Sequence, residues 1–174
     1  DYHGTVSNAI TFRAWDQMSG GNGSLVALPT SVADVMDSFG SASFSNNNGS
    51  VSWSGSWIES DAGGSGAAVG DIDITSGYMR FRPVSVGNSI ARQVNLSNSS
   101  SATFSFSMPF NSLGSGQIQV QVSSNGGSNW TTLQTITSAT PTGTLSYDIS
   151  LYMSSNTQIR FYGSVASTAG IRID

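Results

Sequence analysis

The stretch Asp71-Ile-Asp-Ile-Thr-Ser-Gly-Tyr-Met-Arg-Phe-Arg82 specifies an antiparallel β-hairpin without help from the rest of the chain. Apolar and charged residues alternate on both sides of Ser76-Gly77, a dipeptide that favours a two-residue turn. A turn centred there places the isoleucines opposite Met79 and Phe81. A register shifted by one residue would place them opposite arginines instead, so the pattern predicts a single pairing.

The charged residues of this hairpin form a second predicted ladder, on the face opposite the isoleucines. The same register pairs Asp71 with Arg82 and Asp73 with Arg80. Exposed ion pairs contribute only about 0.2–1 kcal/mol each. We therefore expect these structural ion pairs to fix the register of the hairpin more than to add stability.

Short alternating segments, with turn signals about every 8–12 residues, continue to the end of the sequence. Strands are expected near 36–44, 49–59, 70–75, 78–84, 88–96, 102–109, 117–124, 129–137, 143–149, 157–163 and 170–174. Apolar residues nowhere keep a helical period over three turns. We therefore predict an all-β domain over 33–174, an antiparallel two-sheet sandwich that is jelly-roll-like, preceded by an extra N-terminal strand.

Residues 1–24 are predicted to contain that N-terminal strand, at 5–15, and a Gly/Ser/Asn hinge at 19–24. The residues expected to carry the strand are Val6, Ile10, Phe12 and Trp15. A lone strand with an apolar face is not stable in water and invites association. We expect it to complete a sheet of a neighbouring copy and so to build fibres. The alternatives are that it ends an upstream repeat or folds back on its own domain.

The composition points to the outside of a bacterial cell. Only 9% of the 174 residues are charged, against about 25% in ordinary globular proteins, and there is no cysteine. The net charge of −4 offers no basic stripe for phosphates, so nucleic acid and anionic membrane surfaces are poor partners. Without an apolar run of about 18 residues, membrane insertion is not expected either. We predict an extracellular or cell-surface protein.

A series of short motifs carries a family resemblance over most of the chain. They are Asp37-Ser-Phe39, Asn48-Gly-Ser-Val-Ser-Trp53, Gly77-Tyr-Met-Arg-Phe81, Ala91-Arg-Gln-Val-Asn-Leu-Ser97, Val122-Ser-Ser-Asn-Gly-Gly-Ser-Asn-Trp130, Tyr147-Asp-Ile-Ser150, Ile159-Arg-Phe161 and Ile171-Arg-Ile-Asp174. In this order they resemble a jelly-roll-like domain of large secreted bacterial adhesins, similar to MAM and carbohydrate-binding sandwiches. The upstream piece Ala9-Ile-Thr-Phe-Arg-Ala-Trp-Asp-Gln17 is similar to the closing strands of cadherin-like adhesin repeats. The resemblance implies extracellular, adhesive or sugar-related roles without fixed catalytic residues.

The chain offers few residues for catalysis. His3 is the only histidine and lies near the start of the sequence, away from any core serine motif. Glu59 and Asp61 stand two residues apart at one strand end, which is too local to define the two sides of a glycosidase cleft. We therefore expect no catalytic residues and predict that the protein is not an enzyme.

The tryptophans allow two interpretations. Trp53 and Trp57 would share one face of the strand expected at 49–59, with Gly55 between them. Together with Trp130 they are candidates for a platform on which sugar rings stack. The alternative, which the scarcity of other bulky residues favours, is that this face belongs to the core. The expected core also includes Trp130 itself, with Phe104, Phe106 and Phe161.

A structural calcium ion is the only cofactor that the sequence leaves open, with Asp37 and Asp174 as its candidate ligands. Asp71 and Asp73 are better explained as partners of the arginines opposite them. No other cofactor is expected.

The sequence thus predicts a non-catalytic, structural or adhesive extracellular module. Its expected partners are copies of itself or neighbouring modules of the same polyprotein. The alternative is a carbohydrate-binding module of a secreted multidomain protein, with glycans as its partners.

Overall fold

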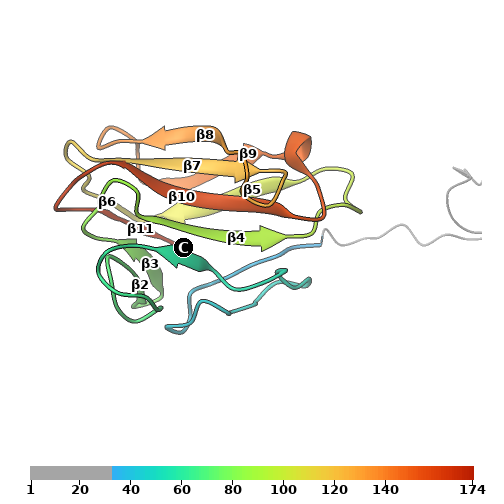
Figure 1. Cartoon of the computed structure of the whole chain (residues 1–174), viewed down its shortest axis with the longest axis horizontal. Coiled ribbons are helices and arrows are strands. Elements are labelled where there is room, and N and C mark those ends of the chain that lie inside the picture. Colours follow the sequence, from blue (N-terminus) through green and yellow to red (C-terminus); the bar gives the residue numbers. More distant parts are fainter. Residues whose placement is uncertain (1–32) are drawn as a thin grey trace, which may run out of the picture. The chain divides into compact units, whose positions relative to one another are not determined.

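The computed structural model describes residues 33–174, and its regular elements there are eleven β-strands and one short 3-10 helix (Figure 1). The strands are β1 (Ile58–Ser60), β2 (Ile72–Thr75), β3 (Tyr78–Phe81), β4 (Ser89–Val94), β5 (Thr103–Met108), β6 (Phe110–Asn111), β7 (Gln117–Ser123), β8 (Thr131–Ile136), β9 (Gly143–Asp148), β10 (Thr157–Val165) and β11 (Ile171–Ile173); the helix η1 spans Ser150–Tyr152. All strand pairs are antiparallel, so the predicted all-β class is confirmed.

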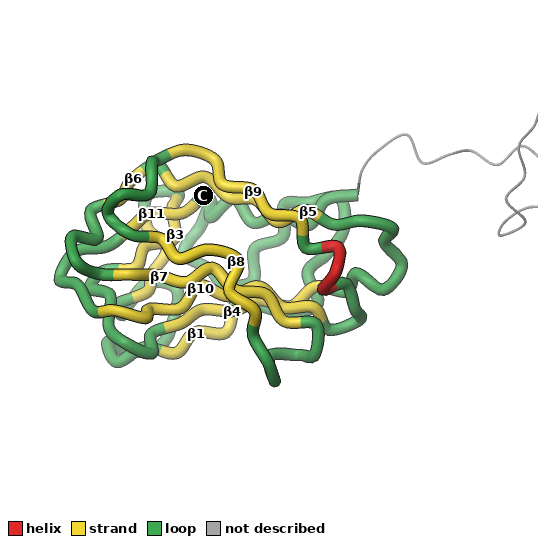
Figure 2. The backbone as a smooth tube through the Cα atoms, turned by 90° about the horizontal axis from the view of Figure 1, so that it is seen from above, coloured by secondary structure: helices red, strands yellow, loops and turns green. Residues whose placement is uncertain are grey.

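The strands form a sandwich of two layers. One layer is the five-stranded sheet β1-β4-β10-β7-β8. The other combines the four-stranded sheet β2-β3-β11-β6 with the pair β5-β9, because Ser107 of β5 and Asp174 exchange backbone hydrogen bonds beyond the end of β11. Figure 2 shows the two layers one above the other.

The hairpin β2-β3 has the register expected from its sequence. Ile72 lies opposite Phe81, Asp73 opposite Arg80, and Ile74 opposite Met79. Ser76 and Gly77 form the turn with φ of 54° and 77°, both in the left-handed region that a tight turn of the I′ type requires. Glycine adopts this conformation at no steric cost, which explains its place in the second turn position.

One of the two ion pairs predicted for this hairpin forms. The guanidinium of Arg80 donates two hydrogen bonds to the Asp73 carboxylate, one of them from Nε at 2.7 Å. The predicted pair of Asp71 with Arg82 is wrong: the Asp71 carboxylate accepts a hydrogen bond from Asn88 Nδ2 at 2.9 Å, and the Arg82 side chain is exposed. The backbones of Asp71 and Arg82 still pair, through a hydrogen bond of 2.7 Å.

The core lies between the two layers and is centred on aromatic rings. Phe161 of β10 contacts Phe106 and Phe81 of the opposite layer edge-on, with centroid distances of 5.0 and 6.3 Å. Phe104 packs against them and is half-buried. The expectation that Trp130 also belongs to this core is wrong, because its side chain lies on the outer side of the five-stranded sheet.

Residues 33–57 depart most from the prediction. Strands were expected at 36–44 and 49–59, but only Ile58–Ser60 forms one. The rest is irregular and folds back on itself, so that 34–36 lies beside 48–51: Asn48 N donates to Met36 O, and Val51 N donates to Asp34 O. Serine and asparagine side chains bind backbone groups here in place of a neighbouring strand: Asp34 N donates to Ser50 Oγ at 3.0 Å, and Ser38 N donates to Asn48 Oδ1 at 3.1 Å.

A buried ion pair fastens this irregular segment to the sandwich. Arg92 of β4 points inward, and its side chain and that of Asp37 are each only 2% exposed. Arg92 Nη1 lies 2.8 Å from Asp37 Oδ2. The other two guanidinium nitrogens donate to backbone carbonyls, Nε to Gly55 and Nη2 to Asn46, at 2.8 and 2.7 Å.

Two tryptophans and a backbone amide complete the surroundings of the pair. The guanidinium carbon of Arg92 lies 4.7 Å from the ring centroid of Trp53 and 5.7 Å from that of Trp57. Trp57 Nε1 and Phe39 N donate to the Asp37 carboxylate, both at 2.9 Å. Burial lowers the pKa of Arg92, and Asp37 opposes that shift by favouring the charged guanidinium.

Removal of this arginine should therefore be costly. In Arg92→Leu the Asp37 carboxylate stays buried without a countercharge, and we expect unfolding in urea to show a loss of about 3–5 kcal/mol. Arg80→Leu is the matched control, because the side chains of its ion pair are 32% and 13% exposed and its loss should therefore cost clearly less than that of the Arg92 pair. Equal destabilisation of the two variants would contradict the anchoring role of Arg92.

Candidate functional site

The outer face of the five-stranded sheet is the surface with the most distinctive chemistry. Along β10, Ile159 and Phe161 are buried in the core, so Gln158, Arg160 and Tyr162 point away from it. By the same alternation the outward residues of β7 are Gln117, Gln119 and Gln121, and those of β4 are Ser89, Ala91 and Gln93. Figure 1 looks onto this face, with the strands of the other layer behind it.

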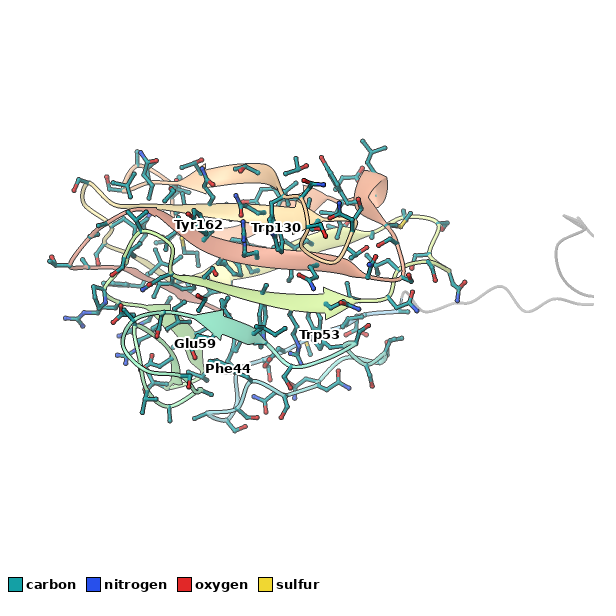
Figure 3. The ribbon with its side chains drawn as sticks, in the orientation of Figure 1. Phe44, Trp53, Glu59, Trp130 and Tyr162 are labelled. Carbon is teal, nitrogen blue, oxygen red and sulfur yellow. The ribbon has the colours of Figure 1, made fainter. Side chains whose placement is uncertain are left out.

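Arg160 is the centre of this face. Its guanidinium carbon lies 4.0 Å from the ring centroid of Trp130 and 4.9 Å from that of Tyr162. Its Nε and Nη2 donate to Gln121 Oε1, at 2.8 and 2.5 Å. Burial beneath these groups lowers the pKa of Arg160. Figure 3 shows Trp130 and Tyr162 over β7 and β10.

The Trp130 ring packs against the guanidinium of Arg160 on the outer side of the sheet. A centroid distance of 4.0 Å places the guanidinium directly over the ring. Arg160 therefore covers one of the two faces of the ring. Trp130 is only half-buried. The face therefore presents an aromatic plate, flanked by a phenol and by amide groups.

A glycine turn puts the tryptophan in this place. Between β7 and β8, Ser123 Oγ accepts a hydrogen bond from Gly127 N at 2.9 Å, and Asn125 Oδ1 accepts one from Asn129 N at 2.9 Å. Gly127 has a φ of 85°, and a Cβ there would lie 3.2 Å from Trp130 Cζ2. Both the positive φ and the closeness of the Trp130 ring therefore favour glycine at position 127.

The polar groups of the face are almost all neutral. Gln121 Nε2 donates to Gln119 Oε1 at 2.8 Å, and Gln158 Nε2 donates to Gln93 Oε1 at 3.3 Å. The outward positions of β4, β7 and β10 hold no acidic residue. Gln121 is only 6% exposed, and its amide is used by Arg160, Gln119 and Thr132. Each amide is both a donor and an acceptor, so the half-exposed Gln93, Gln119 and Gln158 can bind hydroxyl groups in either sense.

The platform predicted from Trp53 and Trp57 is not present. Trp57 is 6% exposed, and the two rings are tilted by 44° at a centroid distance of 5.9 Å. Both flank the buried guanidinium of Arg92, so the interpretation that these rings pack inside the molecule fits the structure better. Trp53 is half-buried like Trp130, but it packs against the core and its Nε1 is buried. Trp130 lies outside that core cluster and is therefore the candidate of the three for stacking against a ligand.

The two acidic residues proposed as calcium ligands differ in their surroundings. Both oxygens of Asp37 accept hydrogen bonds from nitrogen donors, which contradicts its role as a calcium ligand. Asp174 is exposed, and a role for it in calcium binding stays a prediction. Within residues 33–174 no group of three or more histidine, cysteine or acidic side chains is arranged to hold a metal ion.

Glu59 and Asp61 lie side by side at the edge strand β1. Glu59 Oε2 accepts a hydrogen bond from Gly66 N at 2.8 Å, while Oε1 is buried without a partner. Burial, with the nearby Asp61 and Asp73 carboxylates, raises the pKa of Glu59 to about 7. Asp61 caps the loop instead, by accepting hydrogen bonds from Gly63 N and Ile72 N. Sequence spacing alone did not indicate the burial of Glu59.

The predicted assembly strand, with Val6, Ile10, Phe12 and Trp15, lies outside the described residues together with its hinge and His3. Strand donation to a neighbouring copy therefore stays a prediction. None of the described residues belongs to a helix long and apolar enough to cross a lipid bilayer.

Comparison of the chain with known protein families and with curated protein sequences finds no match.

The buried Glu59 carboxyl should make stability depend on pH. Between about pH 4.5 and 7 the unfolded chain has released this proton while the folded chain keeps it. The free energy of unfolding should therefore fall as pH rises through this window, by no more than about 1.4 kcal/mol per pH unit. Glu59→Gln, which is neutral throughout, should remove that slope in urea unfolding measured from pH 4 to 8.

Asp148→Asn is the control for this experiment. The hydrogen bonds of Ser150 lower the pKa of Asp148, so its removal should leave the slope between pH 4.5 and 7 as it is. All other groups are shared by the variants, so the difference between two variants isolates the residue that was changed. A Glu59→Gln curve parallel to that of the unmodified chain would contradict the prediction.

Proposed function

We propose that residues 33–174 form a non-catalytic carbohydrate-binding module of an extracellular adhesive protein, with the outer face of the five-stranded sheet as its ligand surface. The observation that carries the proposal is the half-buried Trp130 ring, which has the guanidinium of Arg160 over one of its faces at 4.0 Å. Tyr162 lies beside the same guanidinium.

Sugars have the surface chemistry that this face complements. One side of a pyranose ring presents C–H groups, which pack well on an aromatic plate, while its edges present hydroxyls. On the same face the half-exposed amides of Gln93, Gln119 and Gln158 offer donors and acceptors, which their mutual hydrogen bonds and the bond from Gln121 hold in place. A few placed polar groups beside an apolar surface are the usual means of orienting a small ligand.

Rigidity supports the same function. The Trp130 ring is braced by the glycine turn and the Arg160 side chain, and Arg160 is braced by Gln121. A platform ordered before binding loses little side-chain entropy when a ligand arrives. The low charge of the chain and its family resemblance support the extracellular adhesive setting.

The platform residue gives the first test. Trp130→Ala should lower the affinity for glycans by about 2 kcal/mol or more, roughly a thirty-fold loss, because the stacking surface disappears. The chain is first screened on a glycan array, and the strongest glycans are then titrated by calorimetry.

Phe110→Ala is the matched control. Phe110 is 45% exposed and also lies near an arginine, Arg172, at 5.3 Å, but on the opposite layer. Its removal should leave glycan affinity unchanged. The proposal fails if the unmodified chain binds no glycan, or if Trp130→Ala and Phe110→Ala bind equally well.

A further inference from the structure

Arg160 differs from the other part-buried arginines in having no carboxylate partner. Among residues 33–174, Arg92 pairs with Asp37 and Arg80 pairs with Asp73. The side-chain hydrogen bonds of Arg160 go to Gln121 alone, which is neutral. Its positive charge is therefore stabilised by two aromatic rings and an amide, with no countercharge.

One edge of this guanidinium is left open. Gln121 Oε1 takes the edge formed by Nε and Nη2. Within the described residues Nη1 makes no hydrogen bond, and Nη2 carries a second N–H. These two nitrogens form the end-on edge of the guanidinium, whose two parallel N–H groups match the oxygens of a carboxylate or a sulfate.

The surroundings favour an anion at that edge. Outward positions on β4, β7 and β10 hold glutamine, serine, alanine and tyrosine beside Arg160, and no acidic side chain that would repel a negative ligand. The chain as a whole carries a net charge of −4. Salt screens distant charges beyond about 8 Å at physiological ionic strength, so the local cation governs what binds here.

We propose that this face selects glycans that carry an anionic group, a carboxylate or a sulfate, beside the sugar ring stacked on Trp130. The proposal rests on the proposed function, since it assumes that Trp130 is the stacking platform. Arg160 then contributes both the support of the ring and the charge that recognises the acid.

The test is a glycan array of matched pairs, in which each glycan bearing a uronate, a sialate or a sulfate stands beside the same scaffold without the charged group. The whole 174-residue chain should bind the charged members at least ten times more tightly than their uncharged counterparts. Preference for uronates and sialates over sulfates would identify the carboxylate as the ligand group, and the reverse preference would identify the sulfate.

Two variants assign the preference to Arg160. Arg160→Gln should bind charged and uncharged members alike, and Arg160→Lys should keep part of the preference because it retains the charge without the paired N–H groups. Arg82→Gln, which removes an exposed arginine from the other layer, should behave as the unmodified chain. Thermal melting establishes that each variant is folded.

The outcomes separate this inference from the function on which it rests. Equal binding of charged and uncharged members, with loss of both in Trp130→Ala, would leave the carbohydrate-binding module intact and overturn the selection by charge. Charge preference that persists undiminished in Arg160→Gln would overturn it as well. Absence of binding to the whole array would overturn both.

Discussion

The buried pair of Arg92 and Asp37 is the constraint on which the rest of the structure depends. An arginine that points into the core from β4 must meet a countercharge, because an isolated buried charge costs several kcal/mol. Asp37 supplies it from a position 55 residues earlier. That one requirement fixes the course of residues 33–57, which contain no strand or helix. It also places the rings of Trp53 and Trp57 against the guanidinium.

Local patterns were sufficient to predict the part of the fold that pairs locally. The hairpin of Ile72–Thr75 with Tyr78–Phe81 carries its own register, and the later strands alternate clearly enough to be placed within a few residues. The segment 33–57 could not be predicted in this way, because its path depends on a distant partner. A signal was present nonetheless: Arg92 stands between Ile90 and Val94 in an alternating strand, which puts it on the buried face.

The candidate site shows the same limit. Arg160, between Ile159 and Phe161, could be placed on an outward face from alternation alone. The side of the sheet on which Trp130 lies could not be predicted by alternation, because this residue follows a turn. Its position depends on the contacts of its ring with Gly127 and Arg160. The sequence therefore left Trp130 open between core and platform. The aromatic plate exists only when two strands far apart in the chain are neighbours.

The position of β11 has a consequence for how the module folds. This strand lies between β3 and β6. It pairs with β3, although the two strands are about 90 residues apart in the sequence. Until β11 arrives, the hairpin β2-β3 has an open edge that can pair with any exposed strand. Sheets completed by such distant segments fold slowly, since a long loop must close before the contacts form. During synthesis the sheet β2-β3-β11-β6 is therefore the part of this module most exposed to wrong pairing with other chains.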